Sequence, residues 1–216
     1  MLYPIFLNLK GRPVLVVGAG SVALGKIQVL LSCGGKVRVI APYAVSEVRE
    51  LSDRGELEYA ARKFDSSDVA GMALVIAATS DAQVNEAVMR CCHASGVWVN
   101  VVDDPPRCDF YVPSLVNRGR LHLAISTEGA SPAFARRLRR ELDHWLHESL
   151  DEYVELLDAA RKRIRQRVSD RAARRSANEA ILNCEARTSL EHGDMEGARA
   201  AIERVLARIE QKRAEA

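Results

Sequence analysis

No apolar run in this chain is longer than a strand, which excludes a transmembrane helix, because such a helix needs about 20 consecutive apolar residues. The N-terminus also lacks the basic residues that precede the apolar core of a signal peptide, and it has no small-residue cleavage site. We therefore expect a cytoplasmic protein with no membrane partner.

Cysteine is scarce and irregularly spaced. The five cysteines are odd in number, and no two of them have the C-x-x-C spacing of a zinc or redox site. The sequence therefore predicts neither a disulfide framework nor a resident metal.

Acidic and basic residues nearly balance over the whole chain, but the basic residues are concentrated in two segments. The formal net charge is +2, whereas residues 161–175 hold eight basic residues and one acid, and residues 136–140 hold four arginines. Clusters of this kind indicate an anionic partner, and for most of 161–175 we expect the alternative, a solvated face of the helices. Aromatic residues make up only 5% of the chain, so base stacking has little support and we do not expect nucleic-acid binding.

The strongest single pattern is a glycine-rich turn between a strand and a helix. The apolar residues 14–17 have the pattern of a buried strand, and GAGSVA follows at 18–23. Gly18 permits the tight turn, Gly20 lets a pyrophosphate approach the backbone, and Ala23 lets the helix pack closely on the strand. The N–H groups that begin the helix would face the phosphates. We predict dinucleotide binding, with a merely structural turn as the alternative.

Strand and helix patterns alternate through the first half of the chain. After the strand at 14–17 we expect strands at 36–40, 57–60, 72–78 and 97–102, and helices at 22–33, 45–54 and, capped by Ser80 or Asp81, up to about 93. This alternation predicts an α/β fold with a Rossmann-like, doubly wound parallel sheet.

The pattern changes near Pro113. One more strand is expected at 121–125, and Ser131-Pro132 has the form of a helix start. Apolar residues spaced three or four apart then indicate one long amphipathic helix or two consecutive ones. Helices at about 177–188 and, after Gly193, at 195–209 would complete a helical bundle.

Several strings together resemble one family, precorrin-2 dehydrogenase, the dehydrogenase and ferrochelatase part of siroheme synthase. The strings are YPIFLNLKGRPVLVVGAGSVA at 3–23, VRVIAP at 37–42, AATSDAQVN at 77–85, VNVVDDPPRCDFYVPS at 99–114 and AISTEGASPAFARRLR at 124–139. Their order and spacing match over about the first 145 residues. The helical tail matches in length and character more than in sequence.

The resemblance implies NAD-dependent oxidation of precorrin-2 to sirohydrochlorin in siroheme biosynthesis, and some members of the family also insert Fe2+ to give siroheme. It implies a homodimer built from an NAD-binding Rossmann domain at 1–112, a central dimerisation segment at 113–148 and a helical domain at 149–216. Two alternatives stand beside this interpretation. One is a regulatory module that senses a dinucleotide without catalysis, and the other is a chelatase alone.

The resemblance also places the cofactor contacts. Besides the two glycines, it implies contacts from Ser21 and Val22 at the first turn and from Pro42 and Tyr43 after the second strand. Neither the usual ribose-binding acid nor an arginine for a 2′-phosphate stands at 40–42, so NAD is implied by the resemblance alone. Thr79 follows the strand at 72–78, at the edge of the sheet where ligands bind.

Asp103 matches the catalytic aspartate of the family. Its carboxylate could accept the proton that leaves together with a hydride, or hold an incoming cation. In the alternative interpretation, Asp103 and Asp104 shape the turn before Pro105-Pro106. On an extended backbone the two side chains would point to opposite faces.

Substrate contacts are implied in the second half of the chain. Ser126 and Thr127 match hydroxyl residues that face the active site in the family, and backbone capping by these hydroxyls is the alternative. Precorrin-2 is an octacarboxylate, so it needs arginines, and about half of those at 136–140 can face one ligand from a helix, with Arg136 as our choice. One residue departs from the family, because Gly25 stands where an arginine is usual.

Overall fold

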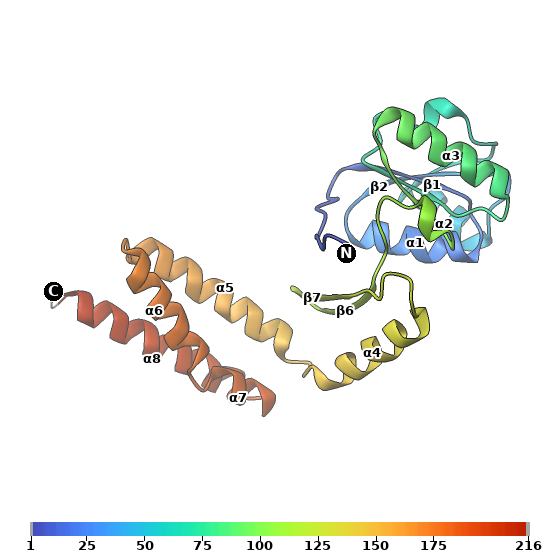
Figure 1. The fold of residues 1–216 in the computed structure, drawn as a ribbon. Helices are drawn as coiled ribbons and strands as arrows, with labels where there is room; N and C mark the ends of the chain where they lie inside the picture. Colours follow the sequence, from blue (N-terminus) through green and yellow to red (C-terminus); the bar gives the residue numbers. More distant parts are fainter. Residues whose placement is uncertain (1, 215–216) are drawn as a thin grey trace. The chain divides into compact units, whose positions relative to one another are not determined.

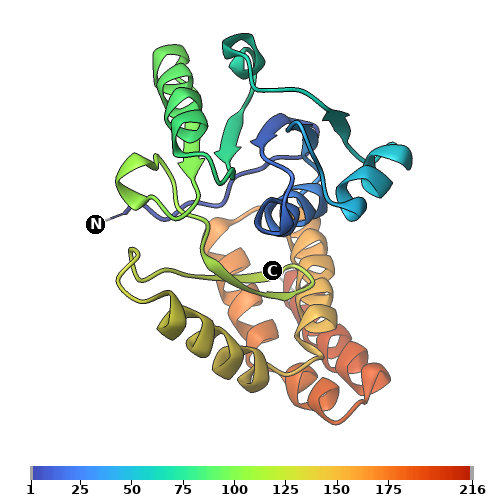
Figure 2. The same cartoon turned by 90° about the vertical axis from the view of Figure 1, so that its right-hand side faces the viewer.

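The computed structural model describes residues 2–214 of the chain, and Figure 1 and Figure 2 show it from two directions. The chain divides into two compact units, Met1–Val112 and Pro113–Ala216. The first unit is built around a parallel sheet, and the second consists of a hairpin and helices.

The first unit contains five parallel strands in the order β3-β2-β1-β4-β5. The strands are β1 (Pro13–Val17), β2 (Lys36–Ile40), β3 (Glu58–Ala60), β4 (Leu74–Ala77) and β5 (Trp98–Val101). The strand order reverses between β1 and β4, and in open α/β sheets this reversal opens a crevice at the carboxyl ends of the strands. The predicted doubly wound sheet is confirmed.

Helices cover both faces of this sheet. Helices α1 (Ser21–Ser32) and α2 (Ser46–Asp53) lie on one face, and α3 (Ala82–Ser95) lies on the other (Figure 1). Successive residues of β1 therefore enter different cores: Val14 and Val16 pack with the α1 side, and the alternate residues of the strand pack with the α3 side. A strand buried on both faces needs the unbroken apolar run that the sequence shows.

The structure decides where α3 begins. The Asp81 carboxylate accepts hydrogen bonds from the N–H groups of Gln83 and Val84, so Asp81, not Ser80, is the cap. Two short 3-10 helices, η1 (Ser66–Val69) and η2 (Pro105–Arg107), were not predicted, because segments of three or four residues have no readable periodicity.

The second unit begins with an antiparallel hairpin, β6 (Ser114–Arg118) and β7 (Leu121–Ile125), followed by α4 (Pro132–Trp145). Figure 2 shows α4 running beside the hairpin. The predicted start of α4 is confirmed, since the Ser131 hydroxyl accepts from the Phe134 N–H at 3.3 Å. Strand β6 was not predicted, because its sequence SLVNR does not alternate and its pairing depends on β7.

Four further helices form the rest of this unit: α5 (Leu150–Arg167), α6 (Arg171–Leu182), α7 (Ala186–Glu191) and α8 (Met195–Ala214). The predicted single helix at 177–188 is wrong. Asp170 accepts from the Ala173 N–H and so starts α6 earlier, and the chain breaks again before α7. The predicted break at Gly193 is confirmed, and Asp194 caps α8 through the Gly197 N–H.

Part of the basic segment 161–175 stabilises this bundle. Arg163 and Arg167 of α5 form ion pairs with Glu203 and Glu210 of α8. These arginines therefore form contacts between helices while staying partly exposed, which agrees with the solvated face expected for most of this segment. No helix within residues 2–214 combines the length and apolarity that crossing a membrane requires.

Two glycines near the start of α1 differ in the space around them, and this predicts opposite effects of alanine. A methyl group at exposed Gly25 would meet nothing within 4 Å, whereas at Gly18, with φ +113°, it would collide with the Ala78 carbonyl oxygen. Gly25→Ala should therefore raise the free energy of unfolding by about 0.5–1 kcal/mol, and Gly18→Ala should lower it by about 1–3 kcal/mol. Urea unfolding measures both, and changes of the same sign would contradict the packing described here.

Candidate functional site

The turn that follows β1 is held against the end of β4. The Gly18 N–H donates to the Ile40 carbonyl at 2.9 Å, and a side chain on Gly18 would strike the Ala78 carbonyl. Glycine is therefore required here by close backbone approach as well as by its positive φ. As a result, the β1–α1 turn and the residues after β4 lie together at the carboxyl edge of the sheet.

The start of α1 fits a phosphate group. Gly20 is its N-cap and supplies no side-chain hydrogen bond, and a Cβ there would meet nothing within 4 Å. Ser21 and Val22 are exposed, and the first turn of α1 contains no acid. Open backbone N–H groups at the positive end of a helix dipole suit an anion.

The loop after β2 borders the same turn. The Val45 N–H donates to the Ala19 carbonyl at 3.0 Å, which fixes the loop beside the glycines. Pro42 and Tyr43 are exposed in this loop, and 86% of the Tyr43 surface is accessible. This rim is apolar or neutral, which suits the uncharged face of a nucleoside.

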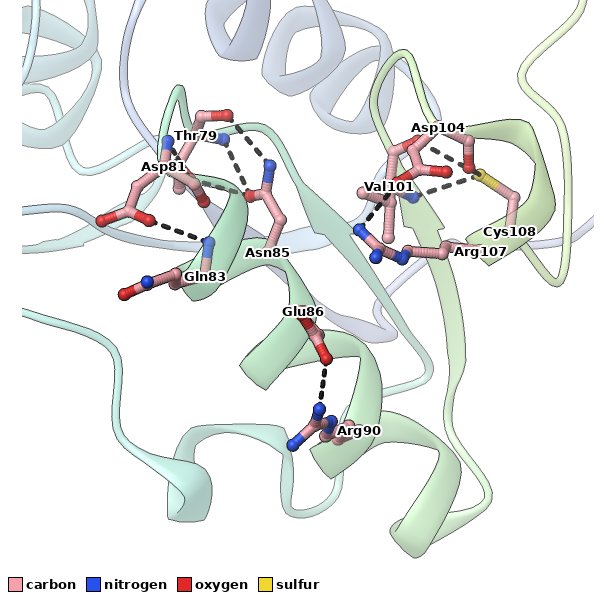
Figure 3. Close-up of polar contacts among 10 residues, drawn as sticks. All are labelled: Thr79, Asp81, Gln83, Asn85, Glu86, Arg90, Val101, Asp104, Arg107 and Cys108. Carbon is pink, nitrogen blue, oxygen red and sulfur yellow. Dashed lines mark hydrogen bonds and ion pairs between the residues drawn. The ribbon is translucent and has the colours of Figure 1, made fainter.

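Thr79 is bound into the β4–α3 loop by the buried side chain of Asn85 (Figure 3). The Asn85 amide oxygen accepts from the Thr79 N–H at 3.3 Å and from its hydroxyl at 2.8 Å, while the amide nitrogen donates to the Thr79 carbonyl at 3.0 Å. These bonds give the loop one conformation next to Gly18. The sequence alone provided no reason to select Asn85. Its contact with Thr79 forms only when the first turn of α3 lies against the loop that follows β4.

Asp103 lies where the chain turns after β5. The Val102 N–H donates to the Ala77 carbonyl at 2.9 Å, so this turn neighbours the end of β4. The Asp104 N–H donates to the Val101 carbonyl at 3.2 Å, and Asp103 has φ +60° in the turn that this bond closes. The extended backbone that would point the two aspartates to opposite faces is therefore not present.

The two carboxylates of the turn have different surroundings. Asp104 pairs with Arg107 at 2.9 Å, as Figure 3 shows. Asp103 is exposed, and no described residue forms an ion pair with it. The turn-forming alternative thus describes the backbone of both residues, and it leaves the Asp103 carboxylate available to a ligand.

Cys108 occupies the inside of this turn. Its sulfur accepts from the Val101 N–H at 3.2 Å and lies 3.1 Å from the Val101 carbonyl oxygen and 3.3 Å from that of Asp104. Burial raises the pKa of the Cys108 thiol, so it stays protonated at neutral pH. The sequence showed only a cysteine without a pairing partner.

The predicted substrate residues lie in the second unit, around the turn from β7 to α4. The Ser126 hydroxyl accepts from the Glu128 N–H at 3.1 Å, and the Thr127 hydroxyl accepts from the Ser131 N–H at 3.0 Å. Both hydroxyls therefore cap backbone, as the alternative interpretation stated. Arg136 is exposed on α4, one position before Arg137, which pairs with Glu141.

Within residues 2–214, no group of three or more histidine, cysteine, aspartate or glutamate side chains has the arrangement of a metal site. The residues predicted for cofactor binding and for catalysis gather at one edge of the first unit. The arrangement defines a dinucleotide-binding α/β unit with an exposed carboxylate after β5, at the same edge of the sheet as the glycine turn after β1.

Family comparisons agree with this class. Residues 5–114 match the model of putative NAD(P)-binding proteins, residues 118–144 that of the sirohaem biosynthesis protein central segment, and residues 149–206 that of the sirohaem synthase dimerisation region. The chain therefore belongs to the NAD(P)-binding family of siroheme synthases and precorrin-2 dehydrogenases. The predictions of family and of dinucleotide binding are confirmed.

Individual relatives support the assignment. A siroheme synthase of Nitrosococcus oceani is 38% identical over 203 residues, which is 94% of this chain and 43% of the relative. A siroheme synthase of Methylococcus capsulatus is 41% identical over 172 residues, or 80% and 36% of the two chains. The chain thus spans less than half the length of these relatives. The solved structure of SirC, a precorrin-2 dehydrogenase, is 29% identical to this chain and has a TM-score of 0.77. The match covers 97% of this chain and 100% of the SirC chain.

The uncapped start of α1 makes Gly20→Asp a specific test of dinucleotide binding. Aspartate is a favourable N-cap, so the fold should be retained, while its charge would repel the pyrophosphate. We expect the Kd for NAD, measured by calorimetry, to rise at least about tenfold, given the energy of charge-assisted phosphate contacts. Gly25→Asp adds the same charge farther along α1 and serves as the control. Unchanged binding by Gly20→Asp would remove this turn from the cofactor site.

Proposed function

We propose that this chain catalyses the NAD-dependent oxidation of precorrin-2 to sirohydrochlorin, the step implied by its resemblance to precorrin-2 dehydrogenases. The observation that carries the proposal is the position of Asp103. Its exposed carboxylate follows β5, and the neighbouring ends of β4 and β1 carry Thr79 and the glycine turn.

The reaction removes a hydride and a proton from the macrocycle. NAD, when bound, supplies the hydride acceptor. The Asp103 carboxylate takes the proton, because it is exposed and unpaired among the described residues, whereas the Asp104 carboxylate is held by Arg107. A positioned carboxylate is a general base of ordinary strength for such a step.

The conformation of Asp103 supports a functional role. A positive φ at a residue other than glycine costs of order 1 kcal/mol, and such strain persists mainly at functional sites. Glycine or asparagine would occupy this position of the turn at lower cost. Aspartate is tolerated in this conformation, and unlike glycine or asparagine it adds a negative charge at the turn.

NAD is the favoured dinucleotide in this proposal. Ala41, Pro42 and Tyr43 after β2 offer no cation to a 2′-phosphate, and the Arg38 side chain earlier in β2 pairs with Glu58 at 2.9 Å. The match of residues 5–114 to putative NAD(P)-binding proteins supports a nicotinamide dinucleotide, and the choice of NAD within that class rests on the missing cation after β2 and on the family resemblance. The cytoplasm, which holds the NAD pool, is the compartment that the proposal requires.

The second unit supplies the substrate contacts. Arg136, Arg139 and Arg140 of α4 form no ion pair with any described residue, so their charge is available to the carboxylates of precorrin-2. The Ser126 and Thr127 hydroxyls accept backbone bonds and keep their own protons for donation to the same substrate.

The proposal includes the domain division at 1–112, 113–148 and 149–216 and a homodimer. The match of residues 149–206 to a dimerisation region supports the assembly. Light scattering coupled to size-exclusion chromatography should therefore give twice the mass of one chain. A monomer at micromolar concentration would contradict the homodimer while leaving the oxidation untouched.

Substitution of Asp103 tests the proposed reaction. Asp103→Asn preserves the backbone preference of the turn and removes the base, so turnover of precorrin-2 should fall by at least about 100-fold. The Kd for NAD should stay unchanged. Asp103→Gly should likewise be inactive, and it should unfold at a higher urea concentration because it relieves the positive φ.

The assay follows the sirohydrochlorin spectrum anaerobically in the presence of precorrin-2 and NAD. A regulatory module would bind NAD and leave precorrin-2 unchanged, and an Asp103→Asn variant with full turnover would remove Asp103 from the reaction.

Fe2+ added after the oxidation step tests the second activity, the insertion of iron into sirohydrochlorin. Appearance of the siroheme spectrum would add insertion of Fe2+, as a substrate, to the proposed activity, and an unchanged sirohydrochlorin spectrum would exclude chelation by this chain.

A further inference from the structure

The thiol of Cys108 contacts both ends of the turn that carries Asp103. Its sulfur accepts the Val101 N–H at 3.2 Å, before the turn, and lies 3.3 Å from the Asp104 carbonyl oxygen, after it (Figure 3). The Asn100 amide nitrogen also donates to the sulfur, at 3.4 Å. The thiol therefore joins the end of β5 to the far side of Asp103.

The turn needs such a clamp because its central residue is strained. Asp103 has φ +60°, which an aspartate leaves readily unless its neighbours are fixed. The other bond across the turn is the backbone hydrogen bond from the Asp104 N–H to the Val101 carbonyl at 3.2 Å. The ion pair of Asp104 with Arg107 joins two residues that both follow Asp103, and its side chains are about one-third exposed, so it restrains the turn little. The Cys108 sulfur is therefore the side-chain contact that spans the turn.

The thiol acts as a donor as well as an acceptor. Its single proton can bond the Val101 or the Asp104 carbonyl oxygen, at 3.1 and 3.3 Å. Since burial raises the pKa of Cys108, this proton is present at neutral pH. Deprotonation would place a negative sulfur against two carbonyl oxygens and would loosen the turn.

We propose that Cys108 is a positioning residue that holds the Asp103 carboxylate in place for proton removal. The inference rests on the proposed function of Asp103 and adds a residue that touches neither cofactor nor substrate. Misplacement of a catalytic group by about 1 Å can cost about 100-fold in rate, so loosening this turn should affect the chemical step and not binding.

The experiment compares three variants of the full chain. Cys108→Ala removes all sulfur contacts, Cys108→Ser keeps one donor and one acceptor, and Cys91→Ala removes a thiol of α3 with no hydrogen bond to the turn. We expect Cys108→Ala to lower kcat by at least about tenfold, with the Kd for NAD and the KM for precorrin-2 changed less than about twofold. Cys108→Ser should recover most of kcat, and Cys91→Ala should match the unsubstituted protein.

A double substitution separates positioning from simple stabilisation. In the Asp103→Asn background, Cys108→Ala should lower the residual rate no further, because the group that it positions is already gone. Loss of thermal stability with unchanged kcat, or an equal loss of rate with and without Asp103, would overturn the inference. Should Cys108→Ala fail to fold, Cys108→Val fills the space without hydrogen bonds and takes its place.

The outcomes also distinguish the inference from the function on which it rests. An active Asp103→Asn variant would refute the role of Asp103 itself. An inactive Asp103→Asn variant together with a fully active Cys108→Ala variant would refute only the role of Cys108.

Discussion

The close approach of Gly18 to the Ala78 carbonyl is the constraint on which the site depends. Because no side chain fits between these backbones, the turn after β1 and the loop after β4 form one edge, and the end of β5 joins it through the Val102 N–H. Each loop is then fixed by its own polar contacts: Thr79 by Asn85, and the Asp103 turn by Cys108. The glycine turn and the exposed Asp103 carboxylate therefore lie at the same edge of the sheet, in loops that are held by hydrogen bonds on either side of β4.

The sequence predicted the parts of the fold that arise from local periodicity and capping. The strands around the glycine turn were readable because residues buried on both faces form unbroken apolar runs. Strand β6 was not, since SLVNR gains its structure from β7, and the early start of α6 depends on a cap at Asp170 that the basic residues around it concealed.

The site was predicted by residue type more than by conformation. The glycine at position 20 already implied a helix start whose backbone N–H groups are open to a ligand. In the structure, a Cβ at Gly20 would meet nothing within 4 Å. The positive φ of Asp103 was not predictable, because it depends on contacts with the Cys108 sulfur five residues later and on the end of β5. For Ser126 and Thr127 the sequence left two interpretations open, and their capping of backbone N–H groups does not preclude donation to a ligand.

The ion pairs between α5 and α8 change where the molecule attracts anions. Arg163 and Arg167 belong to the densest basic stretch of the sequence, yet glutamates of α8 neutralise them. Helix α4 has fewer arginines but leaves most of them uncompensated. Arg161, Arg165, Arg171 and Arg174 of the same stretch form no ion pair with any described residue, so uncompensated positive charge remains on the bundle as well as on α4. Moderate salt, which screens exposed charge over about 10 Å, would therefore weaken the attraction of both regions for anions.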